Sequence, residues 1–292
     1  MAAARTGEAS HACGKLVFVD YELRILLHLI TAALYGVLAL YFWRTRWGTA
    51  TTAASPGWER LALAVPLALH AELLYATIFA GGTLHLGVGD AISLIAWLTL
   101  AVYWIGDFFY PLEGLQALVI PGVALAALLP LALPGSPAVA YTGMPAFTAH
   151  FVVAMLAYSL FTIASLHVLL MAYIERRLRA GALPAPLQHL PPLLAMEQML
   201  FRIIGAGFVL LTLALASGIL FSEEVFGKPL RFNHKTVFGI ASWVIFGLLL
   251  AGRALRGWRG RVATRWTLAG FLLLVLAYVG SKFVLEVILG RG

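Results

Sequence analysis

The sequence predicts an all-α fold, a polytopic bundle of about eight transmembrane helices. Of its 292 residues, 62% are hydrophobic and only 11% are charged, whereas about a quarter of the residues in a soluble domain are charged. Apolar runs of about twenty residues recur along the chain, and each can cross the roughly 30 Å core of a bilayer as a helix. The arginines lie in short connections between these runs. They therefore indicate membrane topology and not a nucleic-acid partner.

The order of the helices follows from the order of the apolar runs. We place the eight spans at residues 23–43, 61–81, 89–106, 115–134, 147–173, 201–221, 236–252 and 266–288. The polar segment at 1–20 is expected to be a disordered tail, and residues 21–292 form one transmembrane domain. Cys13 is the single cysteine, which excludes a disulfide within one chain and any multi-cysteine metal site.

The arginines also predict how the bundle is oriented, because short cytoplasmic loops carry an excess of Lys and Arg. They flank three connections: Arg44, Arg46, Arg60, Arg176, Arg177, Arg179, Arg253, Arg256, Arg259, Arg261 and Arg265. With these connections in the cytoplasm and eight spans, both termini lie on the outer, periplasmic side. The connection at 107–114 should then be cytoplasmic too, although it carries Asp107 and no basic residue.

Histidines within or at the ends of the predicted spans are the main functional signal, because a polar side chain there must be paired, hydrated or bound to a ligand. His150 begins the fifth span and His234 the seventh, both on the outer side, and His70 lies in the second span one turn after Pro66. For any one of them, a hydrogen bond to a neighbouring helix is an equally good interpretation. Together they favour haem, because imidazole binds iron well and a porphyrin asks the protein for only one or two axial ligands.

The stretch RFNHKTVFG, residues 231–239, combines an imidazole with two cations at a predicted membrane edge. His234 could ligate iron, while Arg231 and Lys235 could hold the haem propionates beside a helix N-terminus that also favours anions. The alternative is an ordinary solvated turn, whose charge Glu223 and Glu224 nearly neutralise.

Other polar groups have simpler interpretations. His28 and His167 fit hydrogen bonding to neighbouring helices. Lys282 and Glu286 lie one turn apart near the outer end of the last span, where we expect an interfacial ion pair with the lysine stem extending outward.

Several segments resemble the cytochrome c assembly family of membrane proteins, the haem-handling group of the CcsA, CcmC and HemX types, and most closely its YpjD branch. They are HLPPLLAMEQMLFRIIGAGFVLLTLALASGILF from His189, NHKTVFGIASW from Asn233 and GRALRGWRGRVATRWTLAGFLLLVLAYVGSKF from Gly252. The resemblance covers nearly all of the chain beyond the polar tail. It implies a helix bundle in the bacterial inner membrane with haem held by histidines near the outer face. His150 then corresponds to the first outer histidine and His70 to a histidine inside the membrane.

Two departures from the family pattern bear on activity. Haem-lyase and haem-delivery members carry a tryptophan-rich outer motif, WGxxWxWD, where this chain reads SEEVFGKPLRFN without tryptophan. A second outer histidine should follow the span after GWRG, but the chain ends KFVLEVILGRG. His234 could substitute for it geometrically. The missing motif argues against cytochrome c haem-lyase activity.

The sequence thus predicts a non-enzymatic haem-binding or haem-handling protein associated with cytochrome c assembly. Its expected partners are membrane lipid, haem and other membrane or cytochrome-biogenesis proteins. No catalytic triad, zinc-helix motif or phosphate-binding loop competes with this interpretation. Two alternatives stay open: a haem-free scaffold or regulatory partner on the same fold, and a proton-coupled transporter that uses His70 and Glu72 as a relay.

Overall fold

The computed structural model describes residues 2–48, 57–79, 84–109, 115–133, 138–139, 145–181, 192–220 and 234–290, with the backbone alone for 2–21, 46–48 and 138–139. The long helices are α1 (Ala2–Phe42), α2 (Gly57–Ile78), α3 (Val88–Gly106), α6 (Pro145–Arg179), α7 (Leu193–Leu220), α9 (His234–Arg256) and α10 (Gly260–Val275). The shorter helices are α4 (Gln116–Ala126), α5 (Leu129–Ala132) and α11 (Ser281–Phe283), and the strands are β1 (Leu84–His85) and β2 (Ala138–Val139). Three short segments are π-helical: η1 (Trp43–Gly48), η4 (Leu276–Gly280) and η5 (Val284–Ile288).

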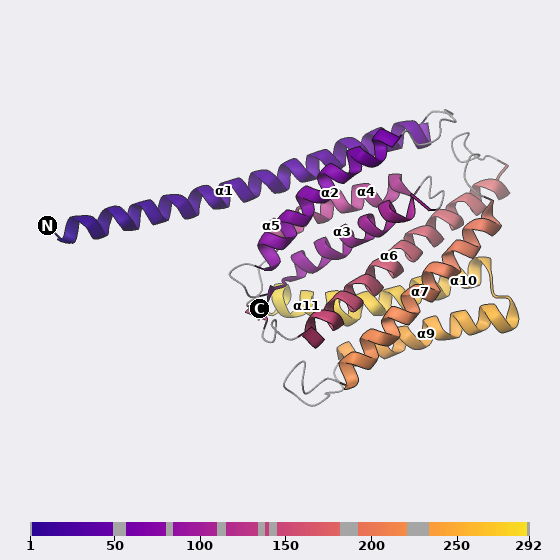
Figure 1. Ribbon diagram of the computed structural model, residues 1–292. Coiled ribbons are helices and arrows are strands. Elements are labelled where there is room, and N and C mark those ends of the chain that lie inside the picture. Colours follow the sequence, from indigo (N-terminus) through magenta and orange to yellow (C-terminus); the bar gives the residue numbers. More distant parts are fainter. Residues whose placement is uncertain are drawn as a thin grey trace.

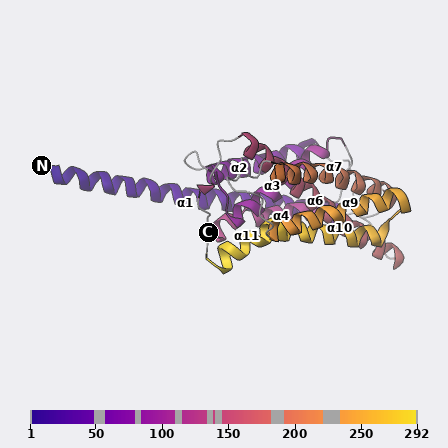
Figure 2. The same ribbon diagram turned by 90° about the horizontal axis from the view of Figure 1, so that it is seen from below.

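The predicted all-α, polytopic bundle is confirmed. In the described part of the chain, seven helices are long and apolar enough to cross a membrane, and a shorter apolar stretch at Gln116–Ala132 takes the place of the predicted fourth span. α10, η4, α11 and η5 form one continuous span from Gly260 to Ile288. α1 is helical from Ala2 onward, and its first half extends beyond the bundle (Figures 1 and 2). The division into a tail at 1–20 and a domain at 21–292 stays a prediction.

The short fourth segment still runs from one end of the bundle to the other. It starts at the end where α3 stops, and it leads to β2, which pairs with β1 beside the end of α2 (Figure 1). The segment breaks after Ala126 because Pro130 has no N–H to donate and the Leu131 N–H bonds to the Leu128 carbonyl. The Ala127 carbonyl bonds instead to Nδ1 of His28 at 2.8 Å. His28 therefore has the structural role that its sequence context favoured.

The bundle is joined through α6, which packs against α3, α7 and α10. At its centre the rings of Phe161 and Phe246 stack at 3.9 Å between centroids. Glycines lie against both rings: a Cβ on Gly207 would lie 3.1 Å from Phe161, and one on Gly270 would lie 2.9 Å from Phe246. Small residues let helices approach this closely in membrane proteins, so Gly207 of α7 and Gly270 of α10 are positions of close helix packing.

The structure places the arginine-rich connections at one end of the bundle, here called the arginine end, and both chain termini at the other, the terminal end (Figures 1 and 2). Asp107 belongs to the arginine end because Arg60 donates from Nε to its carboxylate and from a second guanidinium nitrogen to its carbonyl, both at 2.9 Å. This ion pair explains how an acidic connection fits the proposed topology. Which end faces the cytoplasm stays a prediction.

Cysteine labelling tests that orientation. In a Cys13→Ser background, a membrane-impermeant maleimide should label Leu289→Cys in intact cells and Arg256→Cys only after permeabilisation, since Leu289 lies at the terminal end and Arg256 at the arginine end, both exposed. If only Arg256→Cys were labelled in intact cells, the orientation of the bundle would be opposite to the predicted one.

Candidate functional site

His150 lies near the start of α6 at the terminal end, and its half-buried ring faces α7. Its Nδ1 is 2.9 Å from Oγ of Ser217, and that hydroxyl donates to the Ala214 carbonyl at 3.0 Å. With the Ser217 proton directed at Ala214, the serine oxygen can accept from the imidazole, and the contact holds the ring against α7. A hydrogen bond at one ring nitrogen that orients the other is the usual arrangement around metal-binding histidines.

The partner of His150 was not anticipated from the sequence. A Cβ on Gly218 would lie 3.3 Å from Cε1 of His150, so this glycine also leaves room for the ring. The only signal in the sequence was a serine followed by a glycine near the end of an apolar helix.

His70 lies in the interior between α1, α2 and α3, with no exposed surface. Its Nε2 is 2.8 Å from Oγ of Ser93, and its ring meets that of Tyr35 edge to face, with centroids 5.8 Å apart. Glu72, two residues further along α2, is exposed. The two side chains face different surroundings, so the structure offers no support for the His70–Glu72 relay.

The segment around His234 is only partly described. His234 is the first residue of α9 and is exposed, whereas Lys235 is half-buried and close enough to Lys282 and Glu286 for their charges to interact. Arg231 lies outside the described residues, as does the rest of the connection at 221–233. The predicted propionate clamp therefore stays a prediction.

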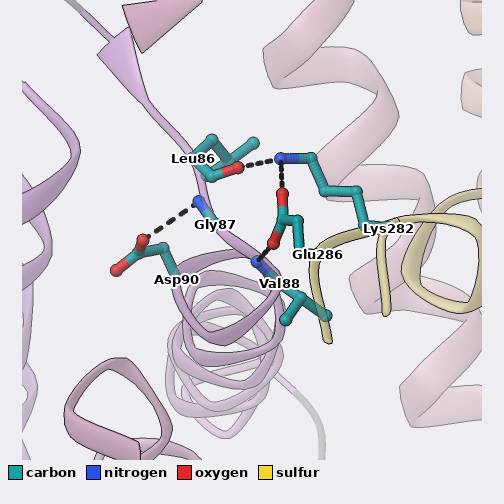
Figure 3. A network of polar contacts seen from close by, with 6 residues as sticks. All are labelled: Leu86, Gly87, Val88, Asp90, Lys282 and Glu286. Atoms are coloured by element: carbon teal, nitrogen blue, oxygen red, sulfur yellow. Dashed lines mark hydrogen bonds and ion pairs between the residues drawn. The ribbon is translucent and has the colours of Figure 1, made fainter. Parts of the chain in front are cut away.

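Lys282 and Glu286 form a buried network, which corrects the expected outward-facing ion pair. Their side chains are only 14% and 5% exposed, and Nζ of Lys282 lies 2.8 Å from Oε1 of Glu286. Figure 3 shows how the pair reaches the start of α3: Lys282 donates to the Leu86 carbonyl, and the Val88 N–H donates to Oε2 of Glu286 at 2.7 Å. The last helix thus supplies a cap for a helix that begins 198 residues earlier.

Asp90 completes this cap from within α3. Its Oδ2 accepts from the Gly87 N–H at 3.1 Å (Figure 3). Carboxylates are favoured at a helix N-terminus because the first N–H groups have no helical acceptors and carry partial positive charge. Together with Lys235, the network holds two carboxylates, Asp90 and Glu286, and two ammonium groups, so its formal charge is balanced.

The motifs that carry the family resemblance contact one another at the arginine end. Arg253 donates to Glu197 at 2.5 Å, and Arg259 lies 3.6 Å from the same carboxylate. The backbone N–H of Trp258 donates to the Gly252 carbonyl, and the indole ring of Trp258 lies directly over Gly252. Glu197 at the start of α7 therefore meets the GWRG turn at residues 257–260, and this contact joins α7, α9 and α10.

Across the described residues, no three His, Cys, Asp or Glu side chains lie close enough together to hold a metal ion. The predicted site residues fall into separate contacts: His150 with Ser217, His70 with Ser93 and Tyr35, and Lys235 with the Lys282–Glu286 pair. Such single imidazoles suit a cofactor that brings most of its own metal ligands.

Comparison with known proteins places the chain in a family. The family model for cytochrome C assembly proteins matches residues 58–289. Inner membrane protein YpjD of Escherichia coli K12 is 31% identical over 244 residues, which cover 80% of this chain and 89% of that protein. A 28.8 kDa protein of Azospirillum brasilense is 39% identical over 142 residues, 48% of this chain and 52% of that protein.

A more distant relative carries a functional name. Cytochrome c biogenesis protein CcsA of Picosynechococcus is 32% identical over 97 residues, 33% of this chain and 27% of that protein. No solved structure matches the chain. From the match over residues 58–289 and the extended similarity to YpjD, the chain is a multi-pass membrane protein that belongs to the cytochrome c assembly family.

Proposed function

We propose that this protein binds or handles haem in the bacterial inner membrane in support of cytochrome c assembly, without itself catalysing haem attachment. The observation that carries the proposal is His150, whose ring is oriented at the terminal end by the contact of Nδ1 with Ser217, on a scaffold whose family is cytochrome c assembly. The relatives named YpjD and CcsA support the membrane location and the pathway.

The residues present fit haem better than a bare metal ion. Bound haem supplies four porphyrin nitrogens around a redox-active iron, and one or two protein ligands complete it. His150 would provide one axial imidazole, with His234 as the second candidate at the same end. His70 would serve a separate position deeper in the membrane, and Lys235 with Arg231 would hold the propionates.

A spectrum of the detergent-purified protein from haem-replete cells tests the proposal. We expect a Soret band that His150→Ala diminishes or shifts, because an axial ligand is lost. His189→Ala, a histidine that the sequence places in a loop at the arginine end, should leave the band unchanged. Ser217→Ala should retain the ligand but weaken haem binding, since the ring loses its orienting partner. Identical spectra for the wild type and the His150 variant would remove His150 from the site.

Replacing Lys235 distinguishes a propionate clamp from a purely structural lysine. A hydrogen bond to a charged group contributes about 1.5–3 kcal/mol, and less in open solvent, so under the clamp model Lys235→Met should weaken haem binding about three- to a hundredfold with little change in the spectrum. His234→Ala should change the spectrum if the imidazole is axial, and only the affinity if it contacts a propionate. If haem titrations match the wild type for both variants while thermal stability falls for Lys235→Met, Lys235 serves the Lys282–Glu286 network alone.

A haem-free scaffold on the same fold is the second candidate. It is favoured by His28 and His167, whose imidazoles bond to the backbone carbonyls of Ala127 and Met196 at 2.8 and 2.9 Å. Under this alternative the purified protein shows no Soret band even when haem is supplied.

A further inference from the structure

The interior between α1, α2 and α3 contains two polar atoms that the described residues leave without a hydrogen bond: the hydroxyl of Tyr35 and Nδ1 of His70. Both side chains are 0% exposed, and their rings meet edge to face. Buried polar groups in proteins are nearly always hydrogen-bonded, to the protein or to ordered water. Two such atoms on touching rings therefore point to a shared polar occupant.

We propose that a buried water molecule binds between the Tyr35 hydroxyl and Nδ1 of His70. Water fits because it can donate and accept at once, as a phenol and an imidazole nitrogen require. Buried waters typically make about three hydrogen bonds to groups that the protein leaves unsatisfied. This site does not depend on haem.

Other buried polar groups of α1 and α3 lie near these two rings. Asp90 at the start of α3 and His28 on α1 are close enough for their charges to interact, and so are His28 and His70. His28 and Tyr35 are seven residues apart and share a face of α1, while Ser93 lies one turn after Asp90 and reaches His70. All five side chains are buried.

The titratable groups around His70 are His28 and Tyr35 on α1 and Asp90 further along α3. On its own helix, Glu72 is exposed on another surface. The proposed water is therefore enclosed among buried groups of α1, α2 and α3.

The sign of one stability change tests the bound water. If water bridges the two groups, Tyr35→Phe removes a hydrogen bond and should lower the Tm, by about 2–4 °C for a loss typical of one hydrogen bond. If the hydroxyl is instead unsatisfied and dry, its removal relieves a cost and raises the Tm. Tyr158→Phe is the matched control, because the Tyr158 hydroxyl donates to the Leu274 carbonyl at 2.7 Å. It should lower the Tm in either case. An unchanged or raised Tm for Tyr35→Phe overturns the proposal.

Water contact can also be measured at His70 directly. In water-edited solid-state NMR of lipid-embedded protein with ¹⁵N-labelled histidine, the His70 signal, identified by its loss in His70→Gln, should build up faster than that of His167. His167 is equally enclosed but bonds directly to the Met196 carbonyl. Build-up no faster than at His167 refutes the water.

Discussion

Glu286→Ala should lower the free energy of unfolding by about 3–5 kcal/mol, the cost of removing one partner from a buried ion pair. The side chain accepts from both Lys282 and the Val88 N–H. Its loss would leave the Lys282 ammonium buried within electrostatic range of Lys235, and it would leave the Val88 N–H at the start of α3 without its acceptor. We expect the Tm in detergent to fall on the order of 10 °C.

Three companion variants identify the cause. Glu286→Gln retains an acceptor for the Val88 N–H and should cost less than Glu286→Ala. Lys282→Met combined with Glu286→Gln should recover part of the loss, because no uncompensated charge remains at that pair. Arg179→Gln breaks an exposed pair with Glu175 on α6, and such pairs contribute only about 0–1 kcal/mol. A Glu286→Ala variant as stable as Arg179→Gln would show that the network does not hold the last helix in place.

Gly252→Ala should be the most damaging single-methyl change at the arginine end. A Cβ at this position would overlap the indole ring of Trp258, so the ring must leave its place over α9. Overpacking of this kind costs about 1–3 kcal/mol, occasionally more. Displacement of Trp258 should also loosen the contact between Arg253 and Glu197, which lies beside it. The measurements are the Tm and the near-ultraviolet circular dichroism of the tryptophans.

Gly122→Ala is the matched control, because a Cβ on Gly122 meets nothing within 4 Å and the residue lies in α4. It should leave the Tm unchanged or slightly raised, since alanine is the better helix former. Pairing Gly252→Ala with Trp258→Leu should restore part of the stability by making room for the methyl group. If Gly252→Ala behaves like Gly122→Ala, the GWRG turn does not depend on this close contact.

The helices were predictable because membrane spans are set by local composition. Twenty apolar residues satisfy their own backbone hydrogen bonds wherever they lie in the bundle, so length and hydrophobicity suffice to find them. The predicted spans at 61–81 and 201–221 correspond to α2 and α7 within a turn or two. The fourth span was predicted as one helix, but Pro130 and the local change in hydrogen bonding divide it into α4 and α5.

The partners of the polar side chains could not be predicted, since they depend on which helix faces come together. Lys282 and Glu286 are one turn apart in the sequence, which suggested a local pair at the interface. Only the packing of the last span against α3 shows that they are buried and that Glu286 caps Val88. His70 and Glu72 are two residues apart and so lie on different faces of their helix, and only the packing shows that one face is buried and the other exposed.

The sequence by itself determined the membrane class, the order of the helices, the gathering of arginines at one end and the resemblance to cytochrome c assembly proteins. All of these depend on composition along the chain and on motifs that are continuous in it. The tertiary structure decided which polar groups meet: His150 with Ser217, His70 with Ser93 and Tyr35, and the last helix with the first turn of α3. The physical reason is that a polar group inside a membrane protein must find a partner within hydrogen-bonding distance, and that partner is fixed by helix packing rather than by its position in the sequence.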